Sequence, residues 1–154
     1  MKLLSRLALV SLVMFTLSAL ADVSRQPVRL ADLPAPVRKT VMQQKGDAGI
    51  LRLEKFAQEG NQIYELELRG RGAGKTVLID ATGKVLEVKQ PIKLSEVSPA
   101  AKAIIESSVG PGTIRTLQSV KIGSGIIAAY EVKFTRDGKQ LQLRIGPDGS
   151  LVQE

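Results

Sequence analysis

The sequence predicts an α+β fold made of two tandem helix-plus-antiparallel-sheet (αβββ) repeats, in which the helix covers one face of each sheet. Three observations support this prediction: segments that alternate apolar and polar residues, turn signals between them, and two amphipathic helical segments in front of them. The alternation makes one face of each sheet apolar and the other polar. That pattern is typical of antiparallel sheets covered on one side.

The first 21 residues are predicted to be a secretory signal peptide, which takes no part in the fold. Lys2 and Arg6 accompany an uncharged apolar run of 15 residues that ends in Ala19-Leu20-Ala21. Small residues there are typical of a cleavage site, and the run is shorter than the roughly 20 residues of a spanning helix. The alternative is an uncleaved membrane anchor. We expect a periplasmic or secreted protein with no stable membrane insertion after cleavage.

Each unit is predicted to begin with a short amphipathic helix. The first helix covers about 34–44 and buries Val37 and Val41. The second has Ser98 as its N-cap and Pro99 at the first helical position, where the missing N–H of proline costs nothing. One face of the second helix is apolar, formed by Ala101, Ile104 and Ile105.

Three main strands are predicted after each helix, followed by a turn and a short fourth piece. In the first unit they cover about 50–57, 62–69 and 75–80, with the short piece near 84–89. In the second unit they cover about 113–121, 126–135 and 139–145, with the short piece at 150–153. We expect the first repeat at 22–90 and the second at 91–154, with Pro91 at the break and the two sheets side by side.

The two units also repeat each other in sequence. Leu30 aligns with Leu94 at a spacing of 64, and "IYELEL" aligns with "AYEVKF" at a spacing of 66. The second alignment pairs Tyr64 with Tyr130 on the apolar faces of the two sheets. Both tyrosines are therefore predicted to be core residues and not ligand contacts.

The stretch "RGRGAGKT" at 69–76 is similar to a phosphate-binding loop, but its spacing and its flanks are not. Gly70 and Gly74 have three residues between them where that loop needs four. A β-branched segment follows in place of the required helix, and the second unit has no Gly-Lys-Thr at the equivalent place. We predict a hairpin connection.

Composition excludes several classes of function. The chain has no cysteine and no histidine, so thiolate nucleophiles, histidine bases and His/Cys zinc or haem sites are excluded. Without Lys2 and Arg6, 20 basic side chains face 15 acidic ones, a net charge of +5. Five aromatic residues in the whole chain do not supply the exposed stacking platforms of a nucleic-acid binder. We expect no nucleic-acid partner.

The helix, the "YE(L/V)" strand and the ending "VLIDATGKVLEV" at 77–88 resemble PepSY and PepSY-like domains. In the second unit Gly146 replaces the aspartate of that ending. The tandem arrangement is similar to the PepSY-like group related to the β-lactamase inhibitor protein. This resemblance implies an exported, non-catalytic binding or inhibitory module, and it does not identify the partner.

The isolated carboxylates fit structural roles. Asp80 and Asp148 are predicted to be turn residues that accept backbone hydrogen bonds, because no D-x-D-x-D run supports calcium. Glu65, Glu67 and Glu131 fall on alternating strand positions and are predicted to be solvated side chains of the polar face and not paired acid/base groups.

We therefore predict an exported, non-catalytic binding module of the cell envelope, such as a protease or hydrolase inhibitor or a peptide-binding protein, with no cofactor, no metal and no catalytic residue. It binds a protein or peptide across the polar sheet faces and their hairpin loops, with Glu131, Lys133 and Arg144 as the predicted contact residues. One alternative is an envelope structural or small-ligand sensor domain. Another is a hydrolase based on serine and lysine, for which the candidates are Ser107, Ser108, Ser124 and Lys102.

Overall fold

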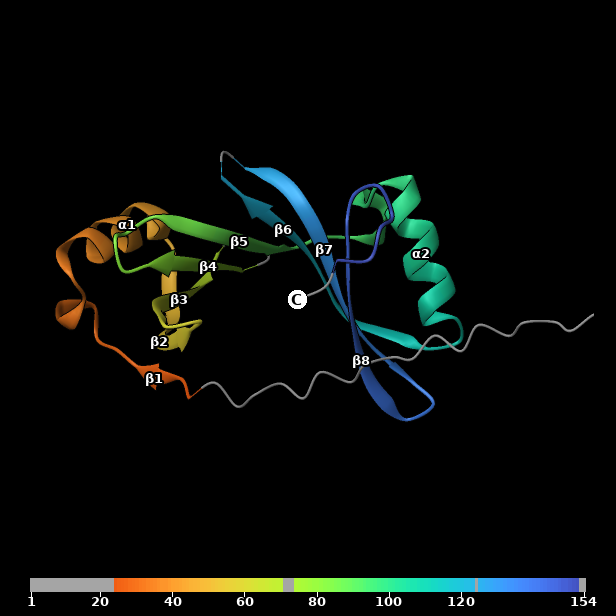
Figure 1. Ribbon diagram of the computed structural model, residues 1–154, viewed down its shortest axis with the longest axis horizontal. Helices are drawn as coiled ribbons and strands as arrows, with labels where there is room; N and C mark the ends of the chain where they lie inside the picture. Colours follow the sequence, from red (N-terminus) through yellow and green to blue (C-terminus); the bar gives the residue numbers. More distant parts are fainter. Residues whose placement is uncertain (1–23, 71–73, 124, 153–154) are drawn as a thin grey trace, which may run out of the picture.

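The computed structural model describes residues 24–70, 74–123 and 125–152, and within them it has the predicted α+β composition. Eight strands form one antiparallel sheet whose strand order is the chain order, from β1 to β8. Both helices pack on the same face of this sheet (Figure 1). The predicted signal peptide at 1–21 lies outside the described residues.

The first half of the chain contributes one helix and five strands: β1 (Gln26–Pro27), α1 (Ala35–Lys45), β2 (Gly49–Gln58), β3 (Asn61–Arg69), β4 (Lys75–Asp80) and β5 (Val85–Pro91). The second half contributes one helix and three strands: α2 (Pro99–Val109), β6 (Thr113–Ile122), β7 (Ile126–Arg136) and β8 (Lys139–Ile145). A short 3₁₀ turn precedes each helix, at η1 (Leu30–Asp32) and η2 (Leu94–Glu96).

Local sequence determines both helices as predicted. Ser98 Oγ accepts a hydrogen bond from the Ala101 N–H, which satisfies one of the free donors at the start of α2. Both helices end at a glycine with positive φ, Gly46 at 49° and Gly110 at 52°, a conformation that costs glycine little. The residues predicted to be buried by α1, Val37 and Val41, are fully buried.

The prediction of two separate sheets is wrong. The short piece expected near 84–89 is a full strand, β5, which pairs with β4 on one side and with β6 on the other. Pro91 does not break the sheet, because it is the last residue of β5 and still lies opposite Gln118. A proline is tolerated there since the ladder ends at that residue.

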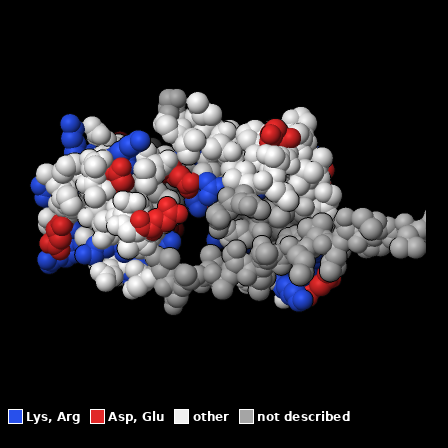
Figure 2. All heavy atoms as spheres, viewed as in Figure 1, with Lys and Arg blue, Asp and Glu red and all other residues white. Residues whose placement is uncertain are grey.

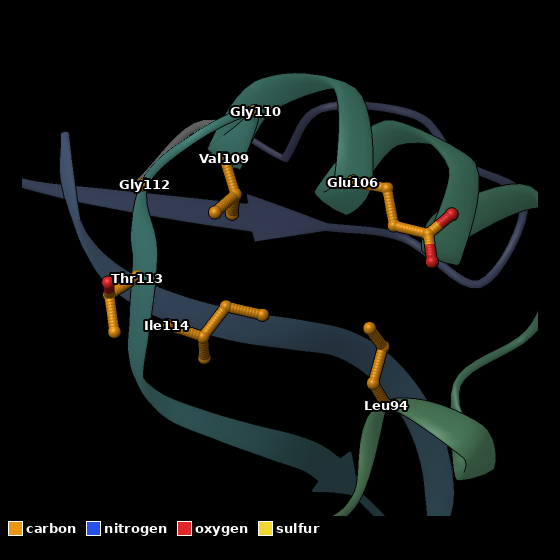
Figure 3. Close-up of a pocket in the computed structure, with 7 residues that line it drawn as sticks. All are labelled: Leu94, Glu106, Val109, Gly110, Gly112, Thr113 and Ile114. Atoms are coloured by element: carbon orange, nitrogen blue, oxygen red, sulfur yellow. The ribbon is translucent and has the colours of Figure 1, made fainter.

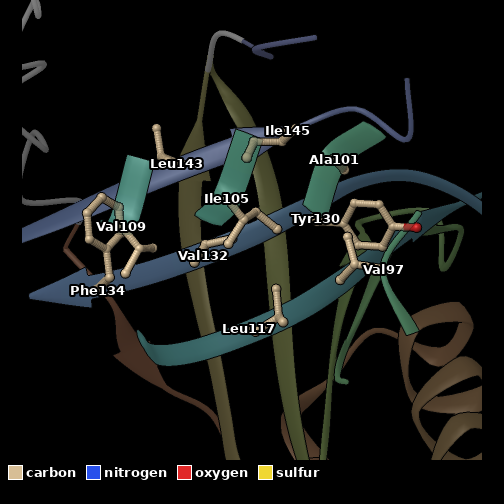
Figure 4. Packing of buried hydrophobic residues seen from close by; sticks show 10 residues of the cluster. All are labelled: Val97, Ala101, Ile105, Val109, Leu117, Tyr130, Val132, Phe134, Leu143 and Ile145. Atoms are coloured by element: carbon tan, nitrogen blue, oxygen red, sulfur yellow. The ribbon is translucent and has the colours of Figure 1, made fainter. Parts of the chain in front are cut away.

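Two hydrophobic cores lie between the sheet and the helices, one per half. The first combines Val37 and Val41 of α1 with Tyr64 and its neighbours on β3 and β4. Figure 4 shows the second, where side chains of α2 meet those of β6, β7 and β8. Tyr64 and Tyr130 are both buried, as predicted.

The sheet is strongly bent between the two halves. Figure 1 shows α1 and α2 on the outer side of the bend, so the face of the sheet without helices lines its inner side. We call this inner face the open face. The side chains on it belong to residues that alternate along the strands with the core residues, as Glu65 does with Tyr64 and Glu131 with Tyr130. The bend turns the open faces of the two halves toward each other.

The strands that flank the glycine-rich stretch pair antiparallel, as a hairpin requires, and residues 71–73 between them lie outside the described residues. β3 ends at Arg69, and Lys75 and Thr76 already belong to β4, which pairs antiparallel with β3. Lys75 Nζ donates to Gln44 Oε1 of α1 at 3.2 Å. Gly74-Lys75-Thr76 therefore leads into a strand and has no helix N-terminus with which to bind phosphate.

Candidate functional site

The open face is covered with charged side chains. The strand pairings place seven further charged residues on the same face as Glu65 and Glu131. These are Arg52, Glu54, Glu67, Glu87, Lys89, Lys133 and Arg144. Figure 2 shows acidic and basic side chains next to one another around the opening between the two halves. Because charges of opposite sign lie within reach of one another, they form ion pairs both along and across the strands.

In the first half, Glu65 on β3 is the centre of these pairs. Its carboxylate binds Arg25, which precedes β1, and it lies 3.7 Å from Arg52 Nη2 of β2. Arg52 also pairs with Glu67 at 3.0 Å. The Arg25 guanidinium lies 4.5 Å above the ring centroid of Phe56, a cation–π contact. Arg25 thus reaches Glu65 across β2, with an apolar side chain beneath it.

In the second half, Glu131 on β7 has the equivalent role. Its Oε2 lies 2.7 Å from Lys89 Nζ of β5, and its Oε1 lies 4.0 Å from Lys133 Nζ. Strand β6 runs between β5 and β7, so the Lys89–Glu131 pair passes over it. The register partner of Lys89 on β6 is Val120, which is fully buried although it lies on the open face.

The two arrangements correspond position by position. Arg25 and Lys89 are 64 residues apart, as are Phe56 and Val120, while Glu65 and Glu131 are 66 apart. We call each set of a cation, the apolar residue beneath it and the carboxylate beyond it a carboxylate clamp. The open face carries one clamp in each half.

A further ion pair depends on the bend. Arg144 Nη2 of β8 lies 2.6 Å from Glu87 Oε1 of β5, although two strands separate them. In a flat sheet, three strand spacings would place their backbones at least about 14 Å apart. The bend brings the edge strand β8 close to the central strand β5, and this pair joins them.

The predicted contact residues do lie together. Glu131 and Arg144 are directly opposite each other on β7 and β8, and Lys133 lies two positions along β7. One part of the prediction is wrong: Glu131 is not a solvated side chain but is buried, because the bend and its two lysine partners enclose it. Glu65 is also largely enclosed, whereas Glu67 and Lys133 are accessible to solvent.

Sequence reasoning missed the other half of this surface. Arg25, Arg52, Glu87 and Lys89 were not predicted, although they make the ion pairs that hold the open face together. The spacing of 64 carried a signal, because it aligns Arg25 with Lys89 as it aligns the two helices.

The β6–β7 hairpin presents exposed apolar residues at the edge of the open face. Ile122 and Ile126 are opposite each other at its tip, and Ile126 is 67% exposed. Ile122 is also opposite Glu87, which places the pair on the open side of the sheet. Figure 1 shows this hairpin projecting beyond the neighbouring strands. An exposed apolar pair at a protruding tip is suited to contact with an apolar surface.

A hollow of about 420 Å³ lies at the C-terminal end of α2, on the outer side of the sheet. In Figure 3, Leu94, Val109 and Ile114 border it from three segments, and Glu106 carries the carboxylate near its rim. One carboxylate on an apolar wall does not provide the converging polar groups that orient a small ligand. The open face is therefore the stronger candidate site.

Asp80 and Asp148 are turn residues, as predicted. Asp80 Oδ1 accepts the Thr82 hydroxyl at 2.6 Å and the backbone N–H groups of Thr82 and Lys84 at 2.8 and 3.0 Å. The Thr82 hydroxyl contributes most to lowering the pKa of Asp80, and the backbone donors add to it. The Ser150 hydroxyl likewise lowers the pKa of Asp148.

The described residues contain no group of three or more metal-ligating side chains close enough to hold a metal ion. Within the same part of the chain, no helix has the length and apolar character needed to cross a membrane.

No protein-family model matches this chain, and no curated protein matches its sequence. Its fold does match solved structures. A DUF2874 family protein from Bacteroides ovatus is 17% identical with a TM-score of 0.60, over 79% of this chain and 85% of that one. A candidate periplasmic protein from Bacteroides eggerthii is 13% identical with a TM-score of 0.63, over 79% and 86% of the two chains.

A BLIP-like protein from Bacteroides fragilis is also similar, at 15% identity and a TM-score of 0.56, over 79% of this chain and 84% of that one. At these identities the likeness concerns the fold alone. This chain has the α+β fold that the DUF2874 and BLIP-like proteins share.

Proposed function

We propose that this chain is an exported, non-catalytic binding module that holds a protein partner against its open face. The observation that carries the proposal is the bent sheet itself, because its helices leave the inner face uncovered and that face is held in shape by ion pairs. Glu87 and Arg144 join the central strand β5 to the edge strand β8, and the exposed Ile122–Ile126 tip stands at its edge. An apolar anchor beside an ordered polar surface is the usual composition of a protein interface.

We also propose that the two halves are tandem copies of one PepSY-like unit. The two carboxylate clamps support this, because their residues keep the spacing of 64 to 66 that relates the helices and the tyrosines. Duplication would explain why one sheet carries two carboxylate clamps. Inhibition of a hydrolase or protease, which the resemblance to the group related to the β-lactamase inhibitor protein implies, is the form of partner binding that we favour.

The proposed location is the periplasm or the extracellular space. The signal-peptide pattern at 1–21 supports it, and so do fold neighbours described as candidate periplasmic proteins. The chain would act there without a cofactor.

Affinity capture with crosslinking from the cell envelope tests the proposal. Thr116 is exposed and lies opposite Lys133 on the open face, so Thr116→Trp places a neutral bulky group in the proposed contact. Ala103→Trp places the same group on the exposed side of α2. We expect the wild-type chain and A103W to recover the same partner and T116W to lose it. Recovery of no specific partner, or equal recovery by both variants, contradicts the proposal.

A further inference from the structure

Three cations of the open face are more exposed than the two carboxylates that hold them. The side chains of Arg25, Arg52 and Lys133 are 42%, 51% and 54% exposed. The carboxylates of Glu65 and Glu131 are only 13% and 6% exposed. An approaching partner therefore meets these three cations before it meets Glu65 and Glu131, and Glu67 is the accessible carboxylate beside Arg52.

Each of these two enclosed carboxylates also orients two cations at once. Glu65 binds Arg25 and Arg52, and Glu131 binds Lys89 and Lys133. Free arginine and lysine side chains lose rotational freedom when they bind, which weakens association. Cations already held by an enclosed carboxylate lose less of this freedom, so the face is prepared for an anionic group.

We infer that the open face binds an acidic surface of a partner protein, with Arg52 as the main contact in the first half and Lys133 in the second. This inference rests on the proposed function, since it assumes that the open face is where the partner binds. Carboxylates of the partner would form charge-assisted hydrogen bonds with the outer cations, and the hydrogen bonds to Glu65 and Glu131 would stay in place.

The shape of the face favours a protein over a membrane. The cations lie on the inner side of a bent sheet, where a flat bilayer would touch the rims and not the clamps. A convex protein surface fits the same bend.

Fluorescently labelled poly-L-glutamate is the probe, titrated against the purified chain, with poly-L-lysine and phosphatidylglycerol vesicles as parallel ligands. The variants are Arg52→Gln with Lys133→Gln, and Lys133→Glu alone, which is the milder change because Lys133 is exposed and 4.0 Å from its partner. Lys39→Glu on the exposed side of α1 is the matched control, since it makes the same change in net charge. Circular dichroism confirms that each variant is folded.

We expect wild type to bind poly-L-glutamate in a salt-sensitive manner and K133E and R52Q/K133Q to weaken binding about tenfold. K39E should weaken it less than about twofold. An equal loss in K39E, stronger binding of poly-L-lysine, no binding of poly-L-glutamate, or vesicle binding that depends on the same residues each overturns the inference.

Envelope capture separates the two proposals. If K133E and R52Q/K133Q recover the partner as well as wild type does, the acidic-partner inference fails and the binding function stands. If wild type recovers no partner, the proposed function itself fails.

Discussion

Tyr130 places its ring in the second core and its hydroxyl at the start of α2. The side chain is 3% exposed, and its hydroxyl oxygen accepts a hydrogen bond from the Ser98 N–H at 3.3 Å. We predict that Tyr130→Ala lowers the free energy of unfolding by roughly 3–5 kcal/mol, because it removes a large buried aromatic side chain. Tyr130→Phe keeps the ring and should cost about 1 kcal/mol, from the lost hydrogen bond. Urea unfolding measures both, and an unchanged midpoint in Y130A would mean that the ring is not a core residue.

Because of Asp80, the free energy of unfolding should depend on pH in the acidic range. Its pKa is lowered in the folded state, chiefly by the Thr82 hydroxyl, relative to an unfolded value of about 3.9. A carboxyl with a lowered folded pKa stabilises the fold above its unfolded pKa, and that contribution disappears as the pH falls through the folded pKa. We expect Asp80→Asn to reduce stability at pH 7 and to have little effect near pH 2.

Urea midpoints of wild type and D80N at the two pH values test this. The difference between the two proteins should shrink as the pH falls. A difference that stays constant with pH would show that Asp80 contributes by its shape and not by its charge.

At the residue scale the sequence was informative where a side chain's role is local. Asp80 and Asp148 were predicted as turn residues because the donors that they bind lie within four positions along the chain. The burial of Glu131 was not predictable in this way. It depends on Lys89, 42 residues earlier, and on a bend that alternation does not record.

Gly83 sets the contact between the β4–β5 turn and α1. Its φ is +87°, and a Cβ atom there would lie 2.7 Å from the Pro36 carbonyl oxygen. The Thr40 hydroxyl donates to the Gly83 carbonyl and fixes the same contact. We predict that Gly83→Ala destabilises the fold by about 3 kcal/mol, from the positive φ and the clash with the helix backbone.

Gly138→Ala is the matched control for this prediction. Gly138 also has a positive φ, of +73°, but a Cβ there would meet nothing within 4 Å. It should cost about 1 kcal/mol, for the backbone conformation alone. Equal losses of thermal stability in the two variants would show that the turn does not rest against α1.

Elements with a clear period were predicted almost to the residue, whereas strand β1 and the pairing of β5 with β6 were not predicted. Helix α1 and strands β3, β4 and β8 match their predicted ranges to within about two residues at either end. Strand β1 has two residues and therefore no period to detect. The first six residues of strand β5 are all partly buried, so its sequence does not alternate between apolar and polar residues. Pro91 suggested that the first sheet ends there, but the sheet continues from β5 to β6.

The two cores are connected through the β5–β6 pairing and through the ion pairs of the open face. We predict that they unfold together in a single transition, because loss of either half removes pairing partners from the other. Tyr64 and Tyr130 report on the first and second core. Fluorescence of Tyr130→Phe follows the first, and that of Tyr64→Phe follows the second. Transitions at different urea concentrations, after allowance for the cost of each substitution, would mean that the halves unfold separately.

The arrangement of the whole molecule was the least predictable from sequence. Two helix-covered apolar faces could be recognised from periodicity, but their union in one sheet depends on which strand pairs with β5. The same holds for the candidate site. Glu131, Lys133 and Arg144 were identified as neighbours on one face, while their cationic and acidic partners come from strands whose distance is set by the bend.

The order of the strands in the sheet is the order of the strands along the chain, and this affects how quickly the protein folds. Most neighbouring strands follow each other after a short connection, and only β1–β2 and β5–β6 have a helix between them. Few long loops must close before these contacts form, and low contact order speeds folding. For so large a sheet the chain should assemble rapidly, one hairpin at a time, with the two pairings that span a helix, β1–β2 and β5–β6, as its slowest steps.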